Sequence, residues 1–198
     1  MLKIKRLTWI AGLLPIAWLL LQFFDGGLGA NPIQALTRSL GDWALRFLLL
    51  TLAVTPLRML TGWGRIAGLR RTFGLIAFTY ASLHLLSYIG LDQLFDWGTL
   101  WKDLIKRRYI TVGMISFLLL IPLAITSTNS MIKKLGASRW RALHRVVYAI
   151  APLVILHFFM MIRAGYDRPV LYGLAAAALL IMRMVRVTMR QVQDGSTS

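Results

Sequence analysis

The sequence contains no cysteine and no glutamate, and few of its residues are charged. Without cysteine the chain forms no disulfide, no thiolate-ligated iron–sulfur cluster and no covalent c-type haem, since each needs a thiol or thiolate. Without glutamate, a di-iron carboxylate site, which takes several glutamates from a helix bundle, is not expected either. Charged side chains make up 15% of the 198 residues, whereas a typical soluble domain has about a quarter. The composition therefore predicts a domain that lies in lipid.

Long apolar runs are what the chain has in place of charge. Hydrophobic residues make up 58% of it, and six runs come close to the ~20 residues that a helix needs to cross a bilayer. These runs cover residues 7–24, 43–60, 72–91, 109–126, 146–162 and 170–189. The pattern predicts an all-α membrane protein, a six-transmembrane-helix bundle with one domain over residues 1–190 and a short polar C-terminal tail at 191–198.

The first run follows Lys3, Lys5 and Arg6 and in this respect resembles a signal peptide. No convincing small-residue cleavage site follows it, so we interpret it as a retained first span. Prolines lie within several runs or near their ends. They agree with six helices, because transmembrane helices tolerate proline where neighbours satisfy the carbonyl that it frees.

The basic residues are distributed unevenly over the two sides of this arrangement. Of the 23 lysines and arginines, 15 fall on the N-terminal side together with one acid, and 8 fall on the other side with six acids. By the positive-inside rule, this bias predicts that both termini are cytoplasmic. The longest loops, at 25–42 and 92–108, then face outside. The net charge of +16 does not indicate a nucleic-acid partner, because the basic residues stand between apolar runs and not on one face of a soluble fold.

The chain has three histidines, His84, His144 and His157. His84 and His157 lie well inside the third and fifth predicted spans, which run in the same direction. At a rise of about 1.5 Å per residue, both come to roughly 17–18 Å from the cytoplasmic edge. Two neutral imidazoles at one depth form a natural axial pair for haem iron, and without cysteine that haem would be non-covalent haem b. The alternative is two histidines that hydrogen-bond across helices without a metal.

His144 is expected near the cytoplasmic surface, about 19.5 Å below His157 along an ideal helix. Three interpretations stay open: a basic interfacial residue, an axial ligand of a second haem, or part of a flavin or quinone site. A second bis-histidine haem would need a histidine below His84, where the sequence has Arg70 and Arg71. The basic residues near His144 could bind a flavin phosphate or haem propionates, or only set topology and contact anionic lipid. They are Lys133, Lys134, Arg139, Arg141 and Arg145.

Five stretches resemble the MsrQ branch of the ferric-reductase-like transmembrane family, the haem-binding membrane subunits of periplasmic methionine sulfoxide reductase systems. They are GGLGANP at 26–32, LRFLLLTLAVTPLR at 45–58, RRTFGLIAFTYASLHLLSY at 70–88, RYITVGMISFLLLIPLAITS at 108–127 and KKLGASRWRALHRVVY at 133–148. The likeness extends over residues 9–186. It implies six helices with haem ligands on the third and fifth, and His84, His144 and His157 match the family's histidines in place and context.

The resemblance also implies a function and partners. It implies electron transfer through haem b in the bacterial inner membrane, with FMN as a further cofactor. A cytoplasmic flavin reductase or quinol would supply electrons, because the chain lacks the soluble FAD/NADPH domain of larger relatives. The acceptor would be an MsrP-like periplasmic molybdopterin enzyme that repairs oxidised proteins. The chain would then be an electron-transfer subunit without catalytic residues, and residues 92–108 would form a docking loop or an interfacial connector.

Two alternatives to this function stay open at this point. One is a stand-alone ferric reductase, against which the missing nucleotide-binding domain argues. The other is a small transporter with interhelical histidine bonds. Transporters commonly show internal repeats and buried polar sites, and no repeat is visible in this sequence.

Overall fold

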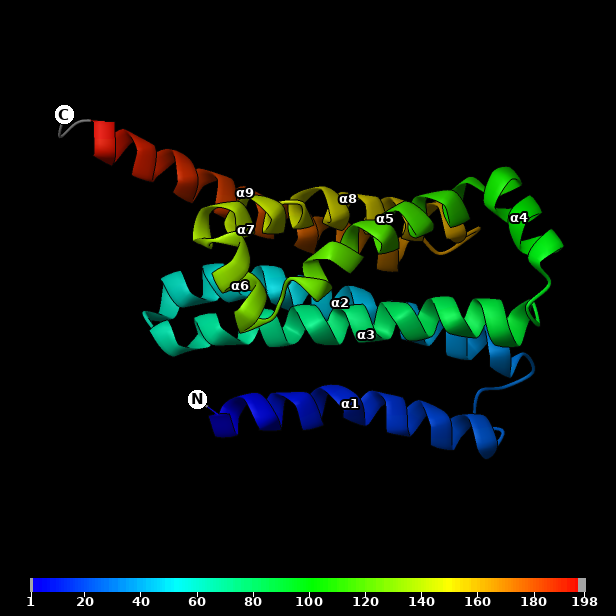
Figure 1. The fold of residues 1–198 in the computed structure, drawn as a ribbon. Coiled ribbons are helices and arrows are strands. Elements are labelled where there is room, and N and C mark those ends of the chain that lie inside the picture. Colours follow the sequence, from blue (N-terminus) through cyan, green and yellow to red (C-terminus); the bar gives the residue numbers. More distant parts are fainter. Residues whose placement is uncertain (1, 196–198) are drawn as a thin grey trace.

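The computed structural model describes the backbone of residues 2–195 and the side chains of residues 2–185. Within this part of the chain, six helical segments are long and apolar enough to cross a membrane, which confirms the predicted all-α six-helix architecture (Figure 1). The main helices of these segments are α1 (Leu2–Phe24), α2 (Pro32–Thr61), α3 (Leu69–Ser87), α5 (Arg108–Ile125), α8 (Val147–Met161) and α9 (Asp167–Gly195).

The helices pack around an antiparallel pair, α2 and α3, that lie along each other. Helix α9 packs against α2 and α8, and α5 packs against α8 and α3. Helix α1 packs against α3 and α2 and forms one edge of the bundle (Figure 1). The start of α1 and the end of α9 lie at the same end of the bundle, as an even number of spans requires.

The structure contains helices in stretches that the hydropathy pattern assigns to loops. Helix α2 begins at Pro32, so most of the predicted 25–42 loop is helical. The Asn31 side chain accepts a hydrogen bond from the Gln34 amide at 3.2 Å and caps the helix, and proline is favoured at the first helical position. Hydropathy misses these turns because they carry polar residues such as Arg38 and Asp42.

Shorter helices occupy the other connections. A 3-10 turn (η1, Gly64–Gly68) precedes α3, and a π-helical turn (η2, Tyr88–Asp92) extends it. Helix α4 (Trp97–Lys106) lies within the predicted 92–108 loop. Helices α6 (Asn129–Leu135) and α7 (Ala137–His144) precede α8.

The sixth helix is longer than the sixth predicted span. Helix α9 continues to Gly195, so residues 191–195 of the predicted tail are helical. Residues 196–198 lie outside the described residues.

The centre of the bundle is fully buried and apolar. Leu52, Ile76 and Ile150 have no exposed surface, and neither has Tyr80, whose hydroxyl donates to the backbone oxygen of Gly12 on α1 at 2.8 Å. A Cβ at Gly12 would lie 2.6 Å from Ile76, so the glycine allows α1 to approach α3 closely. Small residues at such contacts are typical of membrane helices, where close van der Waals packing drives association.

Candidate functional site

His84 and His157 lie beside each other in the structure. His84 comes from α3 and His157 from α8, and their ring centroids are 6.2 Å apart with the ring planes at 79°. We call them the histidine pair. His144 lies elsewhere, at the end of α7.

Each ring of the pair is fixed by a backbone carbonyl on a neighbouring helix. Nδ1 of His84 lies 2.7 Å from the oxygen of Thr37 on α2, and Nδ1 of His157 lies 2.7 Å from the oxygen of Tyr109 on α5. A carbonyl can only accept, so Nδ1 carries the proton in both rings and the lone pair is on Nε2. Among the described residues, no hydrogen bond to either Nε2 is found, and each ring therefore has one nitrogen available to a metal.

A glycine lies under each ring, four residues after the carbonyl that fixes it. A Cβ at Gly41 would lie 3.1 Å from Nδ1 of His84, and a Cβ at Gly113 would lie 2.8 Å from Nδ1 and Cε1 of His157. Thr37 with Gly41 and Tyr109 with Gly113 thus form the same arrangement twice: a helix turn whose first carbonyl binds the ring and whose fifth residue leaves room for it. In the sequence, Gly113 is an isolated glycine in an apolar run and Gly41 lies in the predicted 25–42 loop, and both are weak signals.

The spacing of the pair fits two imidazoles that would bind one metal ion. A metal–imidazole bond is about 2 Å long, and the ring centre lies about 1 Å beyond the nitrogen. Two imidazoles on opposite sides of one metal therefore have centroids roughly 6 Å apart, close to the observed 6.2 Å. Metal-ligating histidines commonly donate their other N–H to a backbone carbonyl, as both rings do here. The two rings make interhelical hydrogen bonds, but to carbonyls and not to each other.

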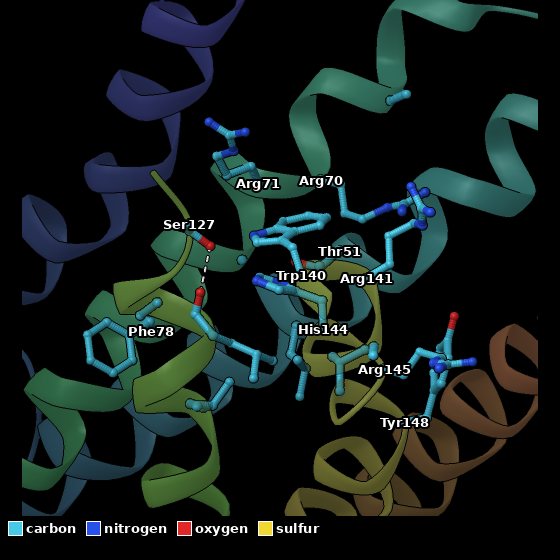
Figure 2. Close-up of a pocket in the computed structure, with 18 of the residues that line it drawn as sticks. Thr51, Arg70, Arg71, Phe78, Ser127, Trp140, Arg141, His144, Arg145 and Tyr148 are labelled. Atoms are coloured by element: carbon cyan, nitrogen blue, oxygen red, sulfur yellow. Dashed lines mark hydrogen bonds between the residues drawn. The ribbon is translucent and has the colours of Figure 1, made fainter. Parts of the chain in front are cut away.

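A second site lies toward the end of the bundle where α1 begins, and we call it the inner cavity. Its volume is about 630 Å³, within the roughly 300–1,000 Å³ range of cofactor pockets. His144 lines it, and its ring stacks on Trp140 at 4.0 Å between centroids (Figure 2). His144 Nε2 lies 3.1 Å from the Thr126 hydroxyl, so ligation through this nitrogen would require that contact to open.

The lining of the inner cavity is strongly basic. Figure 2 shows arginines from α3 and α7 around Trp140 and His144. Among the described residues the lining contains no acid, so the cavity attracts anions such as phosphate or propionate. The basic side chains that line it are Lys5, Arg70, Arg71, Arg141, Arg145 and Arg183. Arg70 and Arg71 thus share this cavity with His144, whereas Lys133, Lys134 and Arg139 are not part of its lining.

The chain from His144 to His157 is not one continuous helix, as the ideal-helix estimate assumed. That estimate treated the chain from His144 to His157 as one helix, but α7 ends at His144 and α8 begins at Val147. A turn therefore separates the two residues and sets their relative directions.

Arg183 on α9 was not singled out by the sequence analysis, although it lines the inner cavity. Its guanidinium is buried, with 8% of the residue exposed. It donates from Nε and Nη2 to the Leu52 oxygen at 3.1 and 2.8 Å, and from Nη2 to the Thr51 oxygen at 3.1 Å. Pro56 has no N–H, so it leaves the Leu52 carbonyl without its partner in α2. Arg183 replaces that partner and joins α9 to α2.

This role predicts a coupling between Arg183 and Pro56. Arg183→Met should lower the free energy of unfolding by about 1–3 kcal/mol, because it leaves the buried Leu52 carbonyl without a donor. In a Pro56→Ala background the backbone amide gained at position 56 satisfies the Leu52 carbonyl, so the same change should cost roughly 1–2 kcal/mol less. Unfolding in mixed detergent micelles measures all four variants. Equal costs in both backgrounds would show that Arg183 acts elsewhere.

Comparison with known proteins agrees with this architecture. The fold and the histidine pair define a multi-pass helical membrane protein in which α3 and α8 bring two histidines together. Residues 40–155 match the family model described as "Ferric reductase like transmembrane component", and the chain belongs to this family.

Its similarity to individual relatives narrows the family further. The chain is 52% identical to the protein-methionine-sulfoxide reductase heme-binding subunit MsrQ of Rhodospirillum rubrum, over 93% of this chain and 88% of that protein. It is 48% identical to the MsrQ of Caulobacter vibrioides, over 90% of this chain and 85% of that protein. Within the ferric reductase-like proteins, its place is therefore in the MsrQ family.

A relative outside MsrQ shows the same domain within a larger protein. The magnetosome protein MamZ of Magnetospirillum gryphiswaldense is 42% identical to this chain. The similar region makes up 90% of this chain and 28% of MamZ.

Proposed function

We propose that the chain binds haem b between His84 and His157 and conducts electrons across the bacterial inner membrane to a periplasmic methionine sulfoxide reductase. The observation that carries this proposal is the histidine pair, with centroids 6.2 Å apart and each Nδ1 bonded to a backbone carbonyl. The MsrQ relatives of this chain are named heme-binding subunits of a protein-methionine-sulfoxide reductase.

The chain's own residues have simple roles in this proposal. His84 and His157 would hold the haem iron through Nε2, and the carbonyls of Thr37 and Tyr109 fix each tautomer and ring position. Haem held by these two imidazoles would supply one-electron redox chemistry. The pair stands between apolar helices long enough to span a membrane. No acid–base catalyst is needed, in keeping with an electron-transfer subunit that is not the catalytic one.

The direction of transfer follows from the proposed topology. The excess of basic residues on the side of the N-terminus supports cytoplasmic termini, and His84 and His157 then lie in the periplasmic half of the membrane. The acceptor is an MsrP-like molybdopterin enzyme, which takes up two electrons and two protons to convert methionine sulfoxide to methionine and water. The donor is a cytoplasmic flavin reductase or quinol.

The inner cavity is proposed to bind a second redox group on the donor side. Its basic lining, its volume and the stacked Trp140 and His144 fit a planar group with anionic substituents. FMN and a second haem b with His144 as a candidate ligand both meet this description. His144 is thus a candidate cofactor-binding residue of the inner cavity and not a partner of the outer pair.

Reoxidation of the reduced haem tests the proposed acceptor. Under anaerobic conditions, the purified reduced chain is mixed with an MsrP-type enzyme and methionine sulfoxide. The haem absorbance should return to the oxidised form only when enzyme and substrate are both present, with two haem electrons consumed per methionine formed. Reoxidation by ferric citrate that is as fast as with enzyme and substrate would instead support a stand-alone ferric reductase. No reoxidation with enzyme and substrate would contradict the proposed partner.

A further inference from the structure

Helix α4 has three distinct sectors around its axis. Trp97, Trp101 and Ile105 follow one another at intervals of four residues, so they form one apolar stripe. Their exposed fractions are 70%, 65% and 64%. Lys102 and Lys106 are exposed too and lie about 100° further round, because each follows a stripe residue by one position. The third sector faces the protein.

The protein-facing sector fixes the rotation of the helix. Asp103 is 7% exposed, accepts a hydrogen bond from the Tyr88 hydroxyl at 2.8 Å and pairs with Arg107 at 3.0 Å. The Thr111 hydroxyl of α5 donates to the Leu104 oxygen at 2.6 Å. These contacts join α4 to the ends of both α3 and α5. They hold one side of α4 against the protein, so the apolar stripe faces away from it.

The position of α4 places this stripe at the level where two membrane-crossing segments end. It connects η2, which extends α3, to the start of α5, and it lies across the end of the bundle, crosswise to the long helices (Figure 1). The Phe95 ring packs against Trp97 at 6.4 Å between centroids and adds to the apolar side. Leu94 and Phe95 have φ angles of 48° and 60°, which are rare for large side chains and mark the sharp turn into α4.

We propose that α4 is an interfacial helix that inserts its apolar stripe into the bilayer at the end of the bundle beside the histidine pair. The lipid is the occupant that matches both exposed sectors. Tryptophan is favoured at the headgroup level, where an amphipathic ring meets both phases. Lysines about a quarter-turn away reach phosphate groups, as in other helices that lie in the interface plane. This inference does not depend on haem binding.

The absence of native cysteine allows a direct test in the full-length chain. Ile105→Cys on the apolar stripe and Lys102→Cys on the basic sector each provide one labelling site without background. Both positions are exposed, so neither change disturbs the core. Each variant is spin-labelled and reconstituted in vesicles of phosphatidylethanolamine and phosphatidylglycerol. Power-saturation EPR then compares collisions with oxygen, which concentrates in lipid, and with a water-soluble nickel chelate.

The spin labels at positions 105 and 102 should differ in their exposure to oxygen and to the nickel chelate. The ratio of oxygen to nickel collisions at 105 is expected to exceed that at 102 by about threefold or more, because one label lies in the acyl region and the other among headgroups. Equal ratios, with nickel reaching both labels as in water, would overturn the proposal and leave the stripe as a surface for a soluble partner. Size-exclusion profiles that match the unlabelled chain serve as the check that both variants are folded.

Discussion

Alanine at either His84 or His157 is expected to remove the low-spin haem spectrum from the purified protein. A bis-histidine iron that loses one axial ligand loses its low-spin state, and the remaining ring has no second protein donor opposite it. Since changes to outer-shell partners alone typically cost about 10–100-fold in metal affinity, loss of a ligand itself should leave less than roughly a tenth of the signal. Reduced-minus-oxidised spectra with haem quantified per chain give the measurement.

His144→Ala is the matched control, because it removes a histidine that lies outside the pair. It should leave the outer low-spin signal unchanged and alter only a group bound in the inner cavity. In the unsubstituted protein, the near-perpendicular rings, at 79°, should give a strongly anisotropic low-spin ferric EPR signal. Full haem content in both His84→Ala and His157→Ala would contradict the ligand assignment and favour histidines that only bridge helices.

The number of spans was predictable because lipid imposes one strong rule on the chain. Every backbone group in the bilayer core must be satisfied internally, so long apolar runs must be helices. The same rule says nothing about polar turns at the membrane surface, and hydropathy therefore missed the start of α2 and the amphipathic α4. Asn31 and Pro32 are favourable residues for the start of a helix, but the predicted span boundaries followed hydropathy alone and did not use them.

The sequence predicted the histidine pair, because both residues lie at the same depth in two spans of the same direction. It did not predict the backbone carbonyls that hold the two rings. Depth needs only residue counts and the rise of a helix. The carbonyls of Thr37 and Tyr109 belong to backbone that any residue could provide, so no side-chain pattern marks them. Arg183 was also invisible as a partner of the Leu52 carbonyl, because the two residues lie 131 positions apart and meet only when α9 packs on α2.

Gly113→Ala is expected to displace the His157 ring and to reduce haem occupancy by roughly tenfold or more, in the range seen when the support of a metal ligand is lost. The new Cβ would lie 2.8 Å from two ring atoms, and the ring cannot move away without breaking its bond to the Tyr109 carbonyl. Gly41→Ala should have a smaller effect, because its Cβ would lie 3.1 Å from the His84 ring and a shift of a few tenths of an ångström relieves the contact. Haem content per chain and the EPR signal measure both variants.

Gly173→Ala on α9 separates this steric effect from helix stability. Its Cβ would meet Ile155 and Phe159 at 3.5 and 3.6 Å, which are ordinary contacts. Alanine is favoured over glycine in a helix interior by about 0.8–1 kcal/mol at all three positions, so haem loss confined to the variants under the rings cannot come from weakened helices. Equal haem content in Gly113→Ala and Gly173→Ala would mean that His157 tolerates displacement, and the proposed requirement for a glycine under each ring would be wrong.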